Sequence, residues 1–182
     1  MNQIMDELPS VIDFVTGRKL PRVGSEENRQ AVEKFLVEQK GFLKSDIEVG
    51  VRIAFEVSGR PYASAVDLIV SLENRRLVAV KCAAGSLGSR EREILAAARI
   101  VDAYQVPCSV VSDGRTAIIL DTVTGKKRGE GLDKIWSREQ ALLFAGTFKP
   151  VGLTEERIQK ERLIFRTYDV MNVNVVRPGS HP

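Results

Sequence analysis

Histidine is almost absent from this 182-residue chain, because the one copy is His181, the penultimate residue. This excludes a Ser-His-Asp hydrolase, a His-ligated zinc site and histidine acid–base catalysis. Aromatic residues make up only 6% of the chain, and Trp136 is the single tryptophan, so no base-stacking platform is expected. Any catalytic chemistry must come from carboxylates, lysine, arginine, hydroxyls or the two cysteines.

Cysteine is also scarce, and its spacing fits no metal site. Cys82 and Cys108 form no CxxC pair, and each lies in an apolar, β-like run, which indicates small buried strand residues. No apolar run approaches the ~20 residues of a membrane span, and no signal-peptide apolar region follows Met1. We therefore expect a cytoplasmic protein with reduced thiols and no membrane partner.

The remaining composition is that of a globular domain of ordinary size, with 43% hydrophobic and 28% charged residues. The net charge of +3, from 27 basic and 24 acidic residues, is too small to indicate a nucleic-acid partner by itself. Any binding to phosphate would have to come from local clusters of basic side chains.

Hydrophobic periodicity predicts an α/β fold with a three-strand meander between two helices. Four of the expected helices have a Ser or Thr N-cap, and Gly41 ends the first of these four. The expected helices are residues 4–15, 25–40, 90–104, 138–145 and 155–168, with N-caps at Ser25, Ser89, Ser137 and Thr154. The expected strands are residues 49–57, 62–72, 76–83, 108–111 and 116–120. The basic segments 17–24 and 124–129 are expected to be loops.

This order divides the chain into three parts. Residues 1–24 form an N-terminal helix and basic loop, residues 25–125 form the α/β core, and residues 126–182 form a C-terminal helical extension and tail.

Two charged residues interrupt otherwise apolar strands of this core. Asp67 lies within Val66-Asp67-Leu68-Ile69-Val70, and Lys81 ends the run Leu77-Val78-Ala79-Val80-Lys81. A buried charge requires a partner, a metal or an exposed strand end. Because the turn between the strands is centred near Asn74, antiparallel pairing would bring Asp67 and Lys81 together. A carboxylate and an ammonium at one end of a sheet can hold a divalent ion and stabilise a phosphate.

These segments resemble the PD-(D/E)xK nuclease fold, and more narrowly the N-terminal nuclease domain of type I restriction enzyme R (motor) subunits. The resemblance covers roughly residues 25–121 and includes the helix with Glu27, the two strands above and the turn Ser112-Asp113-Gly114. It implies a restriction-endonuclease-like core, Mg²⁺ and DNA as the partner. It also implies catalytic roles for Asp67, Lys81 and the helical Glu27, with Asp67 as a metal ligand.

One position departs from the family motif, because Ala79 stands where the family has the Glu of Glu-x-Lys. With Asp67 alone, Mg²⁺ would keep most of its waters and bind weakly. Some nucleases of this superfamily take the missing carboxylate from the neighbouring helix, for which Glu91 and Glu93 are the candidates. The alternative interpretation of both is ordinary helix-dipole chemistry in a first turn.

Phosphate contacts are expected where that helix begins, at Ser89, Arg90 and Arg92. Three functions stay open. The first is a Mg²⁺-dependent DNA phosphodiesterase, endonuclease-like, with a degenerate or rearranged site, acting as a homodimer or with a protein partner. The second is a catalytically silent nuclease-fold module that binds DNA or a protein. The third is an α/β interaction protein that binds no nucleic acid.

Overall fold

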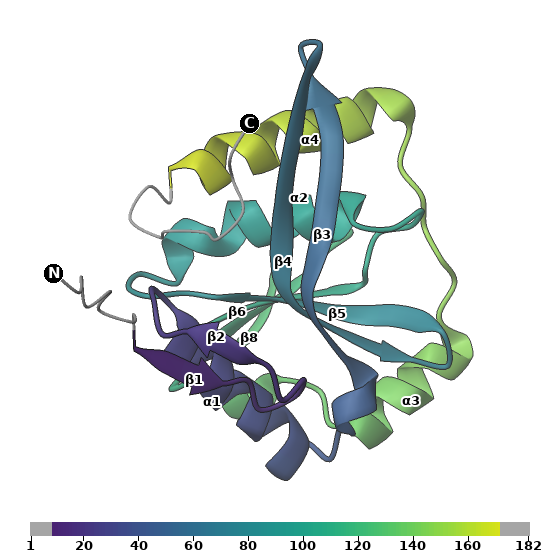
Figure 1. Ribbon diagram of the computed structural model, residues 1–182. Coiled ribbons are helices and arrows are strands. Elements are labelled where there is room, and N and C mark those ends of the chain that lie inside the picture. The colour runs from purple at the N-terminus through teal and green to yellow at the C-terminus, as the bar shows by residue number, and fades with distance from the viewer. Residues whose placement is uncertain (1–8, 172–182) are drawn as a thin grey trace, which may run out of the picture.

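The computed structural model describes residues 9–171, in which a six-stranded mixed sheet is covered by helices on both faces (Figure 1). Helices α1 and α3 pack on one face, and α2 and α4 pack on the other. The predicted order of helix, three-strand meander, helix, strand and strand is confirmed.

The strands of the large sheet follow one another in sequence order, from β3 to β8. All neighbours are antiparallel except β5 and β6, which are parallel because the chain crosses over through α2 between them. The strands are β3 (Ile47–Val57), β4 (Arg60–Leu72), β5 (Arg75–Cys82), β6 (Cys108–Ser112), β7 (Ala117–Asp121) and β8 (Lys127–Glu130).

Four α-helices lie where periodicity places them, although α2 is shorter than expected. They are α1 (Glu26–Glu38), α2 (Glu91–Ile100), α3 (Arg138–Thr147) and α4 (Glu155–Val170). Ser137 and Thr154 accept the expected N-cap hydrogen bonds, whereas Ser25 occupies the N-cap position without one. The Ser89 prediction is wrong, because Ser89 lies within the 3-10 turn η2 (Gly88–Arg90) and donates to the Ser86 carbonyl instead.

Three segments differ from the sequence expectation, and the first is the basic loop predicted at 17–24, which contains a strand at Lys19–Pro21. The helix predicted for residues 4–15 is wrong over its described part, since β1 (Ser10–Ile12) pairs with β2 (Lys19–Pro21), and residues 4–8 lie outside the described residues. The Asp13 carboxylate accepts the Thr16 amide and so favours a turn over a helix here. The basic loop expected at 124–129 contains the start of β8, an edge strand that pairs with β7. Because β8 is mostly charged, it has no apolar alternation from which a strand could be predicted.

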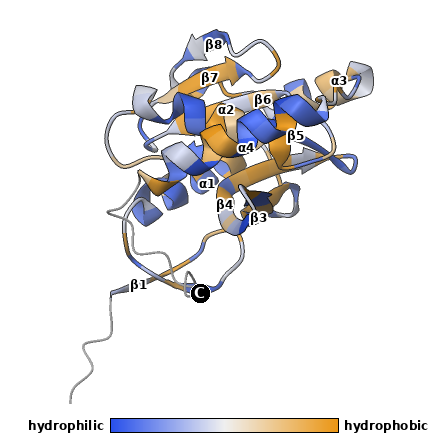
Figure 2. Ribbon diagram, turned by 90° about the horizontal axis from the view of Figure 1, so that it is seen from above, coloured by the Kyte–Doolittle hydropathy of each residue, from blue (hydrophilic) through white to orange (hydrophobic). Residues whose placement is uncertain are grey.

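Alternate residues of the central strands point to opposite faces and build two hydrophobic cores. Val78 and Val80 face α1 and α3, whereas Ala79 faces α2 and α4. Figure 2 shows the central strands as largely hydrophobic between the more hydrophilic helices. No helix in the described part of the chain is long and apolar enough to cross a membrane.

Candidate functional site

Asp67 lies where β4 is unpaired on both sides. The β4–β5 ladder ends at the pair Leu68 and Val80, so Asp67, the residue that precedes Leu68 in β4, has no partner in β5. On the other side, the β3–β4 ladder skips Gly50, whose φ of 66° takes its backbone out of the extended conformation. The Asp67 carboxylate instead accepts the Cys82 amide at 2.7 Å. This bond fixes the carboxylate at the carboxyl end of β5.

Lys81 lies beside this carboxylate, as the strand geometry predicts. Its Nζ is 3.6 Å from Asp67 Oδ2 and 3.0 Å from Glu93 Oε1. The Lys81 side chain is 12% exposed, that of Asp67 23% and that of Glu93 only 2%. Two carboxylates therefore share one ammonium, and Asp67 is the more accessible of the two.

Glu93 reaches Lys81 from the third position of α2. The Arg90 guanidinium lies 3.6 Å from the other Glu93 oxygen. We call Asp67, Lys81, Arg90 and Glu93 the Lys81 cluster. Its two positive and two negative charges balance, so it carries no net charge.

The other residues singled out from the sequence lie elsewhere. Glu27 is exposed and forms an ion pair with Arg22. Glu91 is two residues before Glu93, about 200° around the helix, and it is partly exposed. Ser89 and Arg92 are exposed. Of the candidate glutamates, the structure thus brings only Glu93 into contact with Lys81.

Ala79 offers no carboxylate beside Lys81, and the carboxylate of Glu93 from α2 lies there instead. Ala79 is fully buried on the same face of β5 as Lys81, in the hydrophobic cluster that includes Ile94 and Ala97 of α2. This close packing of α2 on β5 places the first turn of α2, and with it Glu93, above the end of the strand.

The end of β5 is also held by α1 and by the turn after β6. Asn28 of α1 donates to the Ala83 carbonyl at 2.6 Å, and the Ala83 amide donates to the Ser112 carbonyl at 2.8 Å. Gly114 has a φ of 83°, and a Cβ there would lie 2.7 Å from the Cβ of Ala31. The turn Ser112-Asp113-Gly114 therefore needs its glycine to pack against α1.

A second cluster of charged residues surrounds Arg29 and was not predicted from the sequence. Arg29 of α1 lies 2.9 Å from Asp13, 2.6 Å from Glu26 and 3.0 Å from Glu33. Gln30 donates to both Asp13 and Glu26. We call these five residues the Arg29 cluster. The i,i+3 and i,i+4 spacings around Arg29 could have indicated the helical pairs, but nothing in the sequence indicates that Asp13 joins them.

Burial raises the pKa of Glu33 in this cluster to about 7, with Asp13 adding to the rise and Arg29 opposing it. Asp13 behaves differently: hydrogen bonds from Thr16 and the charge of Arg29 outweigh its burial and lower its pKa.

The Lys81 cluster contains two carboxylates, Asp67 and Glu93, that could serve as ligands of a magnesium ion. Mg²⁺ in phosphate-processing sites is held by one or two carboxylates, with water and substrate phosphate completing its shell. Asp67 and Glu93 fit this requirement, because both lie against the same ammonium. Within residues 9–171, no group of three or more His, Cys, Asp or Glu side chains is arranged to hold a metal ion.

Comparison with known proteins identifies the family. The family model for the type I restriction enzyme R protein N terminus matches residues 24–135. This range contains α1, the sheet and the whole Lys81 cluster, and excludes β1, β2, α3 and α4. No curated protein and no solved structure matches the chain. Because the family model covers more than half of the sequence, the chain belongs to the type I restriction enzyme R protein N-terminal family, with its restriction-endonuclease-like fold.

Proposed function

We propose that this protein is a Mg²⁺-dependent DNA phosphodiesterase, endonuclease-like, in which Glu93 supplies the carboxylate that β5 lacks at Ala79. The observation that carries the proposal is the pair of contacts at the Lys81 ammonium, 3.0 Å to Glu93 and 3.6 Å to Asp67. Family membership supports DNA as the partner.

Asp67 and Glu93 would hold the ion. When bound, Mg²⁺ would neutralise phosphate charge and lower the pKa of a coordinated water. The Cys82 amide keeps the Asp67 carboxylate in a fixed orientation. Lys81 would stabilise negative charge that develops on the phosphate, and Arg90 would bind a phosphate oxygen.

A catalytically silent module that binds DNA or a protein is the second candidate. It is favoured by the charge balance of the Lys81 cluster, in which the ammonium and guanidinium already neutralise both carboxylates. In that case the cluster would act as a partly buried ion-pair network, and its residues would matter for stability rather than for turnover.

Nicking of supercoiled plasmid, and cleavage of single-stranded DNA, in Mg²⁺ or Mn²⁺ separates the two candidates. We expect Glu93→Gln and Asp67→Asn to lower the cleavage rate at least ~100-fold, by removing a ligand and its charge. Glu91→Gln is the matched control, since it removes the same charge two residues away, and it should keep the wild-type rate.

A carboxylate exchange tests the assignment of Glu93 further. Adding Ala79→Glu to Glu93→Gln should restore part of the lost rate, because it returns a carboxylate to the strand position beside Lys81. Wild-type protein that stays inert with both metals, while unfolding cooperatively on heating, would contradict the phosphodiesterase and leave the silent module.

A further inference from the structure

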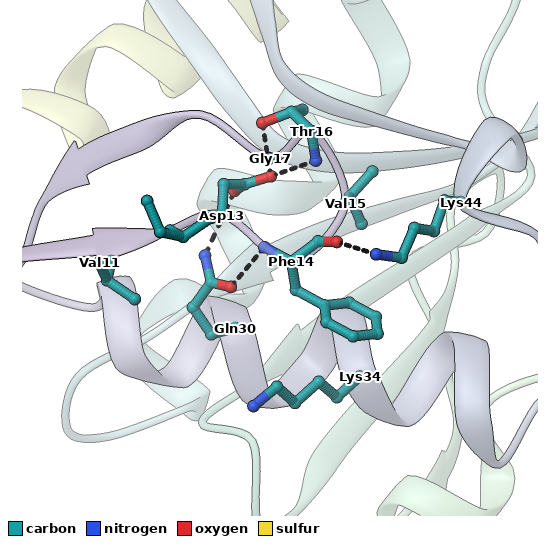
Figure 3. A pocket seen from close by; sticks show the side chains of 10 residues that line it. Val11, Asp13, Phe14, Val15, Thr16, Gly17, Gln30, Lys34 and Lys44 are labelled. Carbon is teal, nitrogen blue, oxygen red and sulfur yellow. Dashed lines mark hydrogen bonds between the residues drawn. The ribbon is translucent and has the colours of Figure 1, made fainter.

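A separate open pocket of about 510 Å³ lies on the N-terminal segment, against α1 (Figure 3). It is lined by residues 11–17, by Gln30 and Lys34 of α1, and by Lys44 of the 3-10 turn η1 (Lys44–Asp46). None of its lining residues belongs to the Lys81 cluster, so the proposed phosphodiesterase chemistry does not account for it.

The turn that forms one wall of the pocket is held rigidly. Asp13 Oδ1 accepts the Thr16 amide at 2.6 Å and the Thr16 hydroxyl at 2.7 Å, and the Asp13 carbonyl accepts the Gly17 amide at 2.8 Å. The Phe14 amide donates to Gln30 Oε1 at 2.8 Å. Because Gln30 and Asp13 are themselves bonded within the Arg29 cluster, the backbone of Phe14 is fixed against α1. A half-buried aromatic ring is thereby presented on a preorganised support.

Two ammonium groups lie over that ring. The Nζ atoms of Lys44 and Lys34 are 4.1 Å and 5.9 Å from the Phe14 ring centroid. Lys44 also donates to the Phe14 carbonyl. In the described part of the chain, neither lysine has a carboxylate within 4.0 Å, and the same is true of Arg18 and Lys19 on the adjoining hairpin. Asp13, the one acidic lining residue, is paired with Arg29. The pocket therefore combines an aromatic ring with two lysines that form no ion pair within the described residues.

A ligand for such a pocket needs an anionic group and a flat, weakly polar group only a few ångströms apart. One nucleotide has this chemistry, since its base can stack on an aromatic ring while its phosphate meets lysines. In duplex DNA the bases are stacked on one another and are not available to a side chain. An acidic peptide would satisfy the lysines and leave the ring unused.

We propose that this pocket binds single-stranded DNA, with one base against Phe14 and the adjoining phosphates at Lys34 and Lys44. The inference rests on the proposed function only in its choice of DNA as the polymer. It adds a recognition site for an unpaired strand, built from seven residues outside the family match and three residues of α1 and η1.

Fluorescence anisotropy with a labelled single-stranded oligothymidylate, in EDTA, tests the site without any cleavage. We expect Phe14→Leu and the double variant Lys34→Glu/Lys44→Glu each to weaken binding about tenfold or more, through lost stacking and lost phosphate contacts. Phe14→Tyr keeps an aromatic ring and should bind within about twofold of wild type. Lys149→Glu/Lys160→Glu makes the same charge change at exposed positions far along the chain and should also stay within about twofold.

The controls separate this site from the phosphodiesterase. Asp67→Asn/Glu93→Gln should lose cleavage and bind the oligonucleotide at least as tightly as wild type, because it removes negative charge beside Lys81 and Arg90. Loss of cleavage and loss of strand binding are therefore independent results. Wild-type affinity in both the Phe14→Leu and Lys34→Glu/Lys44→Glu variants would overturn the proposal. So would equal weakening by Lys149→Glu/Lys160→Glu, or tighter binding of a duplex or of polyglutamate. Free thymidine monophosphate that competes as well as the strand, nucleotide for nucleotide, would show a mononucleotide site and overturn strand binding.

Discussion

The Lys81 cluster and the Arg29 cluster each contain one central cation with carboxylates around it. They differ in charge balance and in how far the carboxylates are exposed to solvent. The Arg29 cluster has three carboxylates around one guanidinium, and Asp13 and Glu33 are at most 1% exposed. The Lys81 cluster has two positive and two negative groups, and its Asp67 side chain is 23% exposed.

The surrounding hydrogen bonds make the same distinction. Asp13 and Glu33 also accept backbone amides, from Thr16 and Val15, so the Arg29 cluster ties the N-terminal hairpin to α1. A planar guanidinium with five donors suits such a closed network, whereas a lysine ammonium is a compact charge that can shift between partners. The Arg29 cluster thus links the hairpin to α1, and the greater exposure of the Lys81 cluster supports the proposal that it is the reactive site.

Replacing the central cation of each cluster should give the largest difference in stability between the two clusters. Arg29→Met leaves three carboxylates without their cation, two of them fully buried, and we expect it to lower the free energy of unfolding by about 3–5 kcal/mol. Lys81→Met leaves Arg90 beside Glu93 and water near Asp67, so a loss of about 1–2 kcal/mol is expected. Urea denaturation followed by circular dichroism measures both. Equal losses would remove the distinction between the clusters.

The pH dependence of stability should show the effect of the raised pKa of Glu33. Its pKa is raised from 4.5 to about 7 in the folded protein, so the folded state binds more protons than the unfolded state between these values. The stabilisation is full below pH 4.5 and is lost as the pH rises to 7, by about 1–3 kcal/mol. Glu33→Gln imitates the protonated carboxyl and should flatten this decline. Thermal unfolding between pH 4.5 and 8 checks it, and an unchanged slope in the variant would contradict the assignment.

Two equivalent Asp-x-x-Thr turns offer a smaller and better matched test. Thr16 donates to Asp13 through its amide and hydroxyl, and Thr124 makes the same two bonds to Asp121. Because Asp13 is buried in the Arg29 cluster, Thr16→Val should cost about 1 kcal/mol. Thr124→Val lies at an exposed turn and should cost about half as much or less. A larger loss at Thr124 would show that burial of the Arg29 cluster is not what makes its hydrogen bonds matter.

Much of the sheet could be predicted from the sequence because its strands are long and alternate strongly. The β3–β4–β5 meander follows its apolar pattern, and the Asn74 turn alone indicates that Asp67 and Lys81 meet. The N-terminal hairpin could not be predicted in this way. Its strands have three residues each, and they are held by the contacts of Asp13 with α1.

The candidate site was predictable in part for a related reason. Ala79 shows that a carboxylate is missing, and helix geometry alone leaves Glu91 and Glu93 equivalent as replacements. Only the packing of α2 on β5 decides which of the two faces Lys81. Long-range packing likewise brings Phe14, Lys34 and Lys44 together from three separate segments.

Titration of Mn²⁺ followed by electron paramagnetic resonance tests the central claim, that Asp67 and Glu93 jointly hold a divalent ion. We expect one bound ion per chain in the wild type, with at least ~10-fold weaker binding in both Asp67→Asn and Glu93→Gln. Glu91→Gln should bind like wild type. Binding that is lost in Glu91→Gln and kept in Glu93→Gln, or the absence of any bound ion in the wild type, would contradict it.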